Sequence, residues 1–411
     1  MINPIKNCRS CNSKNIKVVF DLGCQTLSGI FRSENIDDIM SGPLTLVKCD
    51  QCDLVQLKHS YPLNEMYNEG YGYRSGATNY MREHLKKIIE FATKNVVLNK
   101  KDTVLDIGCN DGTLLGSYED GQYNLVGIDP VAIKYLDSYH QDTKVVTDFF
   151  TKDNYFSVTT EKAKIVSSIS MFYDLENPVS FAKEVASVLA TDGVWVFEQS
   201  YLPAMLRQNS YDTICHEHLE YYSLSALEYI LQQADMTLVD ASQNEVNGGS
   251  VRLAAVHNNS LLASKISPEA IWLIEQENNH DIHSDNSFSL FQANVDRQKN
   301  DLISLLQELK KKGKSVIGYG ASTKGNVILQ HCGITSELLP CIGDITSFKD
   351  GTFTPGTKIP IISMEKARSL NPDYFLVLPW AFRNDILLRE KESIQNGTKF
   401  IFPLPFVEIV S

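Results

Sequence analysis

The stretch Val104-Leu105-Asp106-Ile107-Gly108-Cys109-Asn110-Asp111-Gly112-Thr113 decides the fold of this chain, because it predicts a buried strand that ends in a glycine-rich turn. Glycines in such a turn let the backbone approach a ligand closely. Further apolar strands are predicted at 124–129, 163–168 and 194–198, with a helix at 81–99 and other helices between the strands. This α/β alternation predicts a largely parallel sheet, with the turn at the carboxyl end of its first strand.

Polar and aromatic residues follow the ends of the next predicted strands. Asp129 ends the second strand, where a carboxylate can accept hydrogen bonds from both hydroxyls of a ribose. Asp148 and Phe149 supply a carboxylate and an aromatic wall for an adenine, and Ser170 follows the third strand. A dinucleotide site favours Gly-x-Gly-x2-Gly, whereas this turn carries Asp106 before a single glycine, which suits the positive methionine end of S-adenosylmethionine.

These motifs together resemble the cofactor site of class I methyltransferases. The residues predicted to bind S-adenosylmethionine are Asp106, Gly108, Cys109, Asn110, Gly112, Asp129, Asp148, Phe149 and Ser170. NAD at this turn, or a glycine turn required only by packing, are the alternatives.

Four of the nine cysteines form two pairs, Cys8-x2-Cys11 and Cys49-x2-Cys52. Each pair can present two thiolates from one tight turn, and four thiolates complete the closed tetrahedral shell of a structural zinc ion. The surrounding residues, 1 to about 70, have short apolar runs and no long helical periodicity. This pattern is expected of a small module that needs a bound metal or another cross-link for stability. A redox dithiol and packed thiols are the alternatives.

Composition restricts the class of protein. The 411 residues are 43% hydrophobic and 21% charged, which is typical of globular proteins with more than one domain. No apolar run approaches the length of a membrane span and residues 1–6 lack the apolar core of a signal peptide, so we expect a cytoplasmic protein without membrane contact. The net charge of −12 argues against a nucleic-acid partner.

A His-Glu-His cluster follows the strand at 194–198. His216, Glu217 and His218 are flanked by Cys215 and by Tyr221 and Tyr222. The two histidines are two positions apart, which excludes the zinc-binding pair of a helical His-Glu-x2-His motif. On an extended segment, the three side chains could instead serve as a base, a group that orients the base and a hydrogen-bond donor. In an extended segment both histidines share a face, so spacing alone does not choose between them.

Several motifs taken together resemble the nucleotide-sugar C-methyltransferases of branched deoxysugar biosynthesis, nearly from end to end. They are the cysteine quartet, the Asp106–Gly112 turn, Met171–Pro178, His216–Ser223 and Asn247–Arg252. The resemblance implies a zinc-binding domain at 1–70, a central Rossmann-like methyltransferase domain at 71–257 and a C-terminal Rossmann-like domain at 258–411 that helps to bind the nucleotide sugar.

The resemblance also assigns roles to residues. It implies methylation at carbon 3 of a nucleotide diphosphate 4-keto-sugar, with His218 as the base, Glu217 as its neighbour and His216 as the second choice. It implies a tyrosine contact from Tyr71-Gly72-Tyr73-Arg74-Ser75, with Tyr73 favoured, and further substrate contacts from Tyr71, Tyr222 and Asn247. Many relatives have tyrosine where this chain has Cys215. A monomer is compatible with the sequence, which does not set the oligomeric state.

A second glycine-rich turn, Gly318-Tyr319-Gly320-Ala321-Ser322-Thr323-Lys324-Gly325, follows another predicted strand. Free N–H groups, hydroxyls and Lys324 predict an anion site, and Arg383 lies in a loop expected at the same edge. The resemblance favours the diphosphate of a nucleotide sugar. There are two alternatives. The turn could bind NAD, with Asp344 in the place of the carboxylate that binds the NAD ribose, or it could be purely structural.

We therefore predict C-methylation of a nucleotide keto-sugar through an enolate. Three other functions stay open: an O- or N-methyltransferase of a nucleotide sugar, an oxidoreductase that uses the second turn, and a binding module that holds zinc and S-adenosylmethionine without catalysis.

Overall fold

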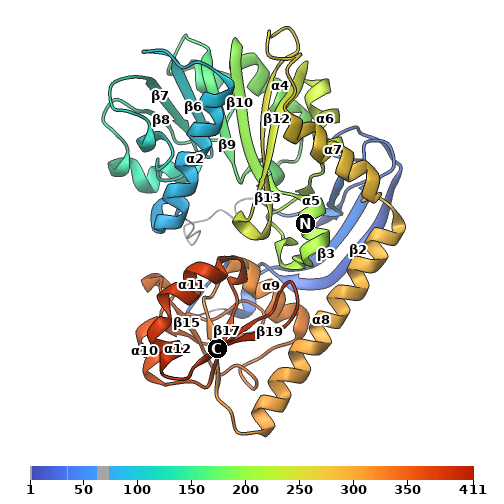
Figure 1. The fold of residues 1–411 in the computed structure, drawn as a ribbon, viewed down its shortest axis with the longest axis vertical. Helices are drawn as coiled ribbons and strands as arrows, with labels where there is room; N and C mark the ends of the chain where they lie inside the picture. Colours follow the sequence, from blue (N-terminus) through green and yellow to red (C-terminus); the bar gives the residue numbers. More distant parts are fainter. Residues whose placement is uncertain (1, 35, 63–73) are drawn as a thin grey trace.

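The computed structural model describes residues 2–34, 36–62 and 74–411. Figure 1 shows a large sheet at one end of the molecule and a smaller one at the other, joined along one side by the N-terminal strands and the long helix α8 (Asp285–Lys311). The predicted architecture, a cysteine-bearing N-terminal module with two Rossmann-like sheets, is confirmed.

The central sheet has the strand order β12-β13-β10-β9-β6-β7-β8. Strands β8, β7, β6, β9 and β10 are parallel, and β13 runs antiparallel to both of its neighbours. The order reverses beside β6, and open α/β sheets bind their ligands outside the carboxyl ends of the strands at such a switch point. The seven strands are β6 (Thr103–Ile107), β7 (Asn124–Ile128), β8 (Lys144–Val146), β9 (Ala163–Ile169), β10 (Leu189–Ser200), β12 (Met236–Asn244) and β13 (Ser250–His257).

Alternating side chains of the central strands fill two separate cores. Val194 and Val196 pack with helix α2 (Asn79–Asn95), whereas Trp195 and Phe197 pack on the opposite face. That face is covered by α4 (Pro178–Val188), α6 (Leu224–Gln233) and α7 (Pro268–His280). Two shorter helices, α3 (Lys152–Phe156) and α5 (Leu202–Gln208), follow β8 and β10.

The expected helices after the first two strands are absent from these described segments. Only the 3-10 turns η3 (Leu115–Ser117) and η4 (Pro130–Ser138) lie there. Gly112, Gly116 and Gly121 interrupt the first of these connections, and glycine disfavours a helix interior by about 1 kcal/mol.

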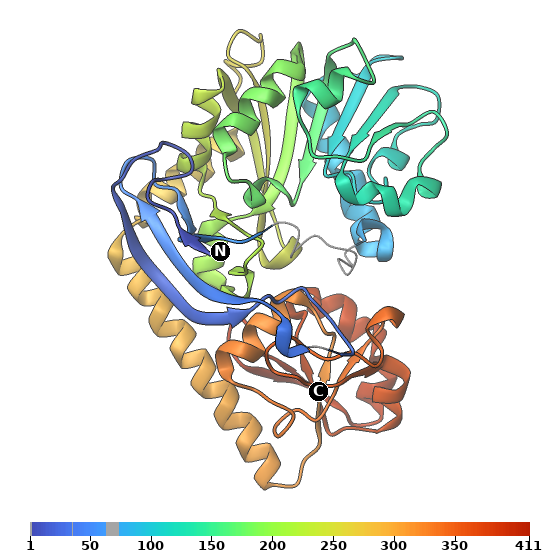
Figure 2. The ribbon, with the colours of Figure 1, turned by 180° about the vertical axis from the view of Figure 1, so that it is seen from behind.

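The N-terminal module is a four-stranded sheet in the order β11-β4-β3-β2. Its strands are β2 (Ile16–Thr26), β3 (Ser41–Cys49), β4 (Val55–Leu57) and β11 (Glu220–Tyr221), and β1 (Asn3–Pro4) pairs separately with β5 (His59–Ser60). Figure 2 shows β2 and β3 as a long curved hairpin that reaches from the central sheet to the C-terminal one. Strand β11 comes from the His-Glu-His region, so that region is part of the N-terminal sheet.

The C-terminal sheet has the order β16-β15-β14-β17-β18-β19, with β19 antiparallel and the reversal beside β14. Its strands are β14 (Val316–Tyr319), β15 (Ile342–Asp344), β16 (Ile361–Ser363), β17 (Tyr374–Val377), β18 (Lys399–Phe402) and β19 (Glu408–Val410). Its helices are α9 (Thr323–Cys332), α10 (Met364–Ser369), α11 (Arg383–Arg389) and α12 (Lys391–Gln395).

One hydrophobic core joins the N-terminal sheet, α8 and the C-terminal sheet. Phe20 of β2 packs against Phe291 of α8 with ring centroids 4.7 Å apart, and both belong to the same buried cluster as Phe375 of β17. The same cluster includes Leu202 and Met205 of α5, so it also reaches the segment that follows β10 of the central sheet. Among the described residues, the structure has no helix of the length and apolarity that a membrane span requires.

Candidate functional site

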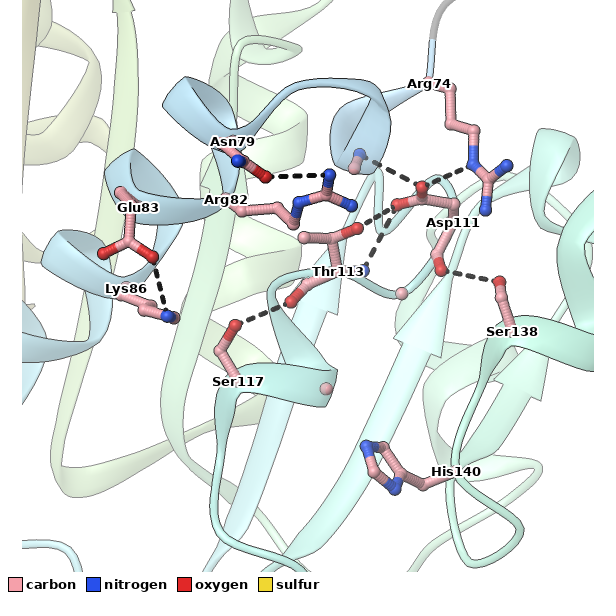
Figure 3. A pocket seen from close by; sticks show the side chains of 13 residues that line it. Arg74, Asn79, Arg82, Glu83, Lys86, Asp111, Thr113, Ser117, Ser138 and His140 are labelled. Carbon is pink, nitrogen blue, oxygen red and sulfur yellow. Dashed lines mark hydrogen bonds and ion pairs between the residues drawn. The ribbon is translucent and has the colours of Figure 1, made fainter.

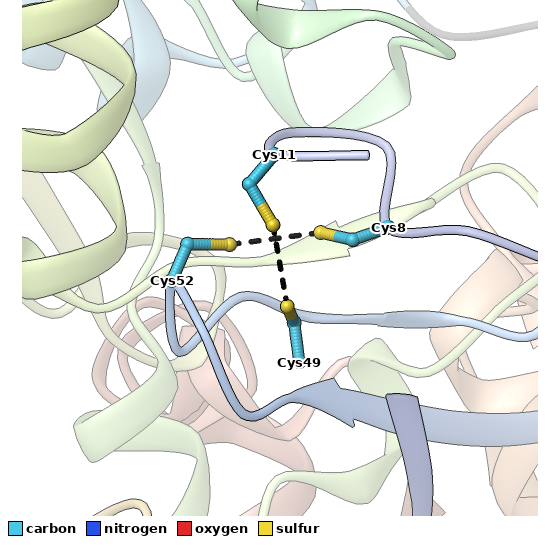
Figure 4. A group of neighbouring side chains, drawn as sticks. All are labelled: Cys8, Cys11, Cys49 and Cys52. Atoms are coloured by element: carbon cyan, nitrogen blue, oxygen red, sulfur yellow. Dashed lines mark hydrogen bonds between the residues drawn. The ribbon is translucent and has the colours of Figure 1, made fainter. Parts of the chain in front are cut away.

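The four predicted zinc ligands meet at one point (Figure 4). The sulfur atoms of Cys8, Cys11, Cys49 and Cys52 all lie within 4.8 Å of one another, with 3.6 Å between Cys8 and Cys52 and 3.4 Å between Cys11 and Cys49. Sulfurs bound at about 2.3 Å to a tetrahedral zinc are about 3.8 Å apart, so the donor set fits that ion. Hydrogen bonds from Cys52 and then Gln56 to the Cys8 sulfur help to lower the pKa of Cys8 to about 5, which favours the thiolate that zinc binds.

The first glycine-rich turn leaves the carboxyl end of β6. Gly108 and Gly112 have φ angles of +75° and +74°, which side chains other than hydrogen rarely allow. Asp106 is buried and accepts a hydrogen bond from Ser167 Oγ at 2.6 Å, and burial raises the pKa of Asp106 to about 7.

The other predicted cofactor residues lie at the same edge of the sheet. Asp129 accepts hydrogen bonds from the N–H groups of Asn110 (2.8 Å) and Val131 (2.6 Å), and burial raises its pKa. Its carboxylate thus also holds the turn itself, a role that the sequence did not suggest. Asp148 and Phe149 are exposed beyond β8, and Ser170 follows β9 with a φ of +54°. Cys109 is buried and accepts a hydrogen bond from the Tyr139 hydroxyl at 3.1 Å.

The chain before α2 docks on this turn through contacts that the sequence did not predict. Asp111 accepts hydrogen bonds from Arg74 Nε at 2.9 Å and from the Gly76 N–H at 3.0 Å, and Ser75 N–H donates to Asn110 Oδ1 at 3.0 Å. Figure 3 shows Arg74 and Asp111 beside a cavity of about 350 Å³ that residues of α2 and of the turn line. The predicted substrate residues Tyr71 and Tyr73 lie outside the described residues, directly before Arg74 in the chain.

The two histidines of the His-Glu-His cluster point into different surroundings, because the chain turns at 216–217 instead of running extended. His216 is fully buried, donates from Nε2 to the Gly42 carbonyl at 3.3 Å and packs edge-on against Tyr61. Burial lowers the pKa of His216 to about 4. His216 therefore packs in the core of the N-terminal sheet, and its role as the second candidate base stays a prediction.

His218 is only partly buried. Its Nδ1 lies 2.8 Å from the Thr213 carbonyl oxygen, and because a carbonyl can only accept, Nδ1 carries the hydrogen. The neutral imidazole then has its lone pair on Nε2. Burial and the charge of Lys324 lower the pKa of His218 to about 3, so the ring is neutral at physiological pH. The Tyr173 ring flanks the imidazole with centroids 4.3 Å apart.

Glu217 does not orient His218, contrary to the expectation that it would, since the Thr213 carbonyl does. A side chain at Gly29 would bring its first carbon within 2.8 Å of Glu217 Oε1 and 3.7 Å of Thr323 Oγ1, so the carboxylate lies between the N-terminal module and the second turn. Oε2 of Glu217 has no hydrogen-bond partner within the described part of the chain, and burial raises the pKa of Glu217.

The second glycine-rich turn reaches the same region from the C-terminal sheet. Lys324 donates from Nζ to the Asn247 carbonyl at 2.6 Å, and Asn247 Nδ2 lies 3.5 Å from Ser170 Oγ. Burial lowers the pKa of Lys324, and the carboxylate of Asp212 opposes that shift. Trp380 also links the C-terminal sheet to the central part of the chain, because its Nε1 donates to Asp212 Oδ2 at 2.7 Å. His218 thus lies beside Thr213 and Tyr173 of the central part of the chain, and the charge of Lys324 from the C-terminal sheet acts on it.

The side chains of two predicted substrate residues bind other groups of the protein. Tyr222 is fully buried, stacks on Phe172 and donates from its hydroxyl to the Phe172 carbonyl at 3.3 Å. Arg383 forms a two-pronged ion pair with Glu408, at 2.5 Å and 3.0 Å. The Tyr222 side chain belongs to the core and the charge of Arg383 is paired within the C-terminal sheet, and the substrate contacts of both residues stay predictions.

Comparisons with known families divide the chain into three consecutive matches. Residues 8–67 match a zinc binding domain, residues 77–241 a methyltransferase domain and residues 245–405 a C-methyltransferase C-terminal domain. The matches follow one another over nearly the whole chain. The prediction of S-adenosylmethionine and structural zinc as cofactors is confirmed.

Two known proteins and one solved structure are similar to all or part of the chain. The chain is 28% identical to the C-methyltransferase NovU of Streptomyces niveus over 100% of this chain and 98% of that protein. It is 26% identical to a ubiquinone biosynthesis O-methyltransferase of Hydrogenovibrio crunogenus over 39% of this chain and 71% of that protein. The solved structure of the plantazolicin methyltransferase BpumL covers 44% of this chain and 86% of its own, with a TM-score of 0.36 and 14% identity. Because a zinc binding domain, a methyltransferase domain and a C-methyltransferase C-terminal domain match consecutive parts of the chain, the chain is similar to C-methyltransferases along nearly its whole length.

Proposed function

We propose that the protein methylates carbon 3 of a nucleotide-linked 4-keto-deoxysugar. The observation that carries the proposal is the bond from His218 Nδ1 to the Thr213 carbonyl, because it leaves Nε2 unprotonated. A base is needed for methylation of carbon and much less for methylation of an oxygen or nitrogen that already has a lone pair.

The chemistry follows from the weak acidity of a C–H bond. A carbon next to a ketone becomes nucleophilic when a base removes its proton and the carbonyl oxygen accepts the charge as an enolate. In this proposal His218 Nε2 takes the C3 proton, and the ammonium of Lys324 lies near enough to lower the pKa of His218 and to favour negative charge on the sugar oxygen. S-adenosylmethionine, when bound, supplies an electrophilic methyl group on its sulfonium.

The residues of the first turn would align that donor. We assign the methionine end to Asp106, Gly108, Cys109, Asn110 and Gly112, the ribose to Asp129, and the adenine edge to Asp148, Phe149 and Ser170. Proper alignment of two reactants is worth roughly 7–11 kcal/mol, so holding the donor matters as much as the base. Glu217, Tyr73 and His216 stay candidate catalytic residues beside His218. The predicted substrate contacts are Tyr71, Tyr222, Asn247, Lys324 and Arg383.

The second turn would hold the diphosphate. Ser322 caps helix α9, whose free N–H groups and dipole favour an anion, and Lys324 adds a positive charge. The sheet order and the turn would also suit NAD, so binding of a nucleoside diphosphate and of NAD should be compared directly.

The test is mass spectrometry of the purified protein with S-adenosylmethionine and GDP-, dTDP- and CDP-linked 4-keto-deoxysugars in deuterated water. We expect a sugar heavier by one methyl group, loss of the exchangeable deuterium at C3 and formation of S-adenosylhomocysteine. His218→Ala should abolish both methylation and base-dependent exchange at C3, whereas the exposed His280→Gln should leave both unchanged.

Two results would reject the proposal. Methylation of sugars that lack a ketone would indicate an O- or N-methyltransferase. Absence of any methylated sugar, with S-adenosylmethionine still bound, would indicate a binding module.

A further inference from the structure

Arg9 lies between the zinc ligands Cys8 and Cys11, and its side chain is buried on the side of the N-terminal sheet that faces the central domain. The guanidinium donates from Nη1 to the Leu57 carbonyl at 2.6 Å and from Nη2 to Ser60 Oγ at 2.8 Å. Its Nε donates to Glu176 Oε2 at 3.1 Å and lies 3.9 Å from Glu220 Oε1. One buried cation therefore joins the zinc module to two acidic residues of the central domain.

The position of Arg9 is set by the metal-binding loop. Its backbone N–H donates to Gln56 Oε1 at 3.0 Å, and Gln56 Nε2 donates to the Cys8 sulfur at 3.1 Å. The same glutamine thus holds both a zinc ligand and the backbone of the arginine that follows it. A change in how Cys8 is held will be transmitted directly to Arg9.

The two acidic partners belong to the two segments that form the surroundings of His218. Glu220 is two residues after His218 in β11, and Glu176 is three residues after Tyr173, whose ring flanks the imidazole. These segments also bind each other, because Leu219 N–H donates to the Tyr173 carbonyl at 2.8 Å.

The backbone reinforces the same connection. Strand β11 pairs with β4, with Glu220 opposite Gln56, and Leu57 N–H donates to the Leu219 carbonyl at 2.8 Å. Glu220 is fully buried, which raises its pKa well above the ordinary value, and the nearby cation of Arg9 opposes that shift. Glu176 is half-exposed and accepts a direct hydrogen bond from Arg9 Nε at 3.1 Å, whereas Glu220 Oε1 lies 3.9 Å from the same nitrogen.

We propose that Arg9 is a positioning residue that transmits the geometry of the zinc-binding loop to His218 and Tyr173. This inference rests on the proposed function of His218 as a base. The zinc module would then act on catalysis through a single guanidinium, although no zinc ligand comes near the reacting atoms. A purely structural Arg9 would instead affect stability, zinc content and cofactor binding together.

The test compares zinc-loaded, full-length wild type with Arg9→Ala, Arg9→Lys and Glu176→Gln. Lys17→Met is the matched control, because it removes an exposed ion pair between the same module and Asp285 of α8. We expect Arg9→Lys and Arg9→Ala to keep one zinc per chain and wild-type affinity for S-adenosylmethionine. Their kcat should fall roughly tenfold to a hundredfold with little change in KM, and deuterium exchange at C3 should fall in parallel, because the base is misplaced.

Chemical rescue gives a reading that a merely structural role would not. Arg9 and Glu176 line an open groove between the zinc loop and α4, so free guanidinium can enter the space left in Arg9→Ala. We expect low concentrations of guanidinium, below those that unfold the protein, to restore part of kcat, and urea at the same concentration to restore none.

Amide hydrogen exchange separates this inference from the proposed function. Peptides that cover 171–176 and 216–222 should exchange their amide hydrogens faster in Glu176→Gln and Arg9→Lys than in wild type. In Lys17→Met the exchange rate of these peptides should equal that of the wild type. If the wild type methylates no keto-sugar, the proposed function fails. The amide hydrogen exchange of the variants would still test whether Arg9 positions the two segments. Unchanged kcat and exchange in the Arg9 variants, or a loss of zinc and of S-adenosylmethionine in proportion to activity, would overturn the inference.

Discussion

The two glycine-rich turns of this protein are built alike and are suited to ligands of opposite charge. Each leaves the first strand of a sheet whose strand order reverses there, and each is held by an acidic residue at the end of the next strand. Asp129 accepts from the Asn110 N–H at 2.8 Å, and Asp344 accepts from the Ala321 N–H at 2.7 Å. The shared backbone design therefore does not set which ligand either turn binds.

The difference lies in the side chains and in the segment after each turn. The first turn has the buried Asp106 behind it and continues into a short 3-10 segment, so it offers a negative group and little helix dipole. The second continues into α9, capped by Ser322 and carrying Lys324 in its first turn, so it offers positive charge and free N–H groups. A cationic sulfonium donor suits the first, and a diphosphate suits the second.

The largest expected effects come from adding a methyl group to one turn at a time. In Gly112→Ala the new carbon would lie 2.7 Å from the Tyr139 ring at a φ of +74°, and in Gly320→Ala it would lie 2.7 Å from Pro379 at a φ of +78°. Strain and overpacking together cost roughly 2–4 kcal/mol, or about a hundredfold in affinity. Calorimetric titration should show loss of S-adenosylmethionine binding only in Gly112→Ala and loss of nucleoside diphosphate binding only in Gly320→Ala. Equal loss of S-adenosylmethionine in both variants would contradict the division of roles.

Removal of one charge should give the next largest effect. Lys324→Met is expected to raise KM for the nucleotide sugar about tenfold or more, because a charge-assisted hydrogen bond contributes about 1.5–3 kcal/mol. The affinity for S-adenosylmethionine should not change. Lys314→Met, at the opposite end of β14 and paired with Asp373 on the surface, serves as the control in steady-state kinetics. An unchanged KM would argue that the second turn is purely structural.

A smaller effect is expected from the acids that brace the turns. Asp129→Asn and Asp344→Asn each keep an oxygen for one N–H and lose the second charged acceptor, at a cost of about 1 kcal/mol in the free energy of unfolding. Urea unfolding should show this loss in both variants. Ligand titration should then show a weaker affinity for S-adenosylmethionine only in Asp129→Asn. If Asp344→Asn lowers this affinity as much, the proposed difference between the two turns is wrong.

The smallest effect concerns the pH dependence of kcat/KM. The base must be neutral, and burial followed by the Lys324 charge lowers the pKa of His218 to about 3, so activity should persist well below the ordinary histidine range. Lys324→Met removes a positive charge, so the pKa of His218 should rise and the acid limb should move to higher pH. Burial remains, so the limb should stay below about pH 6.5, the ordinary histidine pKa. An acid limb that stays in place would show that Lys324 does not act on His218, and one that moves to lower pH would contradict the sign of this effect.

Local spacing made some features predictable. The two Cys-x2-Cys pairs and the Asp106–Gly112 turn depend on residues a few positions apart, and the strand positions follow from apolar runs. The roles of His216 and His218 were not predictable in this way. A turn at 216–217 sends His216 toward Gly42 and leaves His218 against Thr213 and Tyr173.

Contacts between distant segments left no sequence signal. The docking of Arg74 on Asp111, the bond from Trp380 to Asp212 and the Arg9 contacts join residues that are far apart in the chain. The packing of Tyr222 on Phe172 likewise cannot be read from its position next to the candidate base in the sequence.

By itself, then, the sequence determined the zinc quartet, the α/β class and the two glycine turns, because strand periodicity, cysteine spacing and glycine conformations are local properties. Only the tertiary structure decided which histidine is presented, that Thr213 orients it, and that Lys324 reaches it from another sheet. Those outcomes depend on one hydrophobic core that packs the N-terminal sheet, α8 and the C-terminal sheet together, and burial of that kind is a property of the assembled fold.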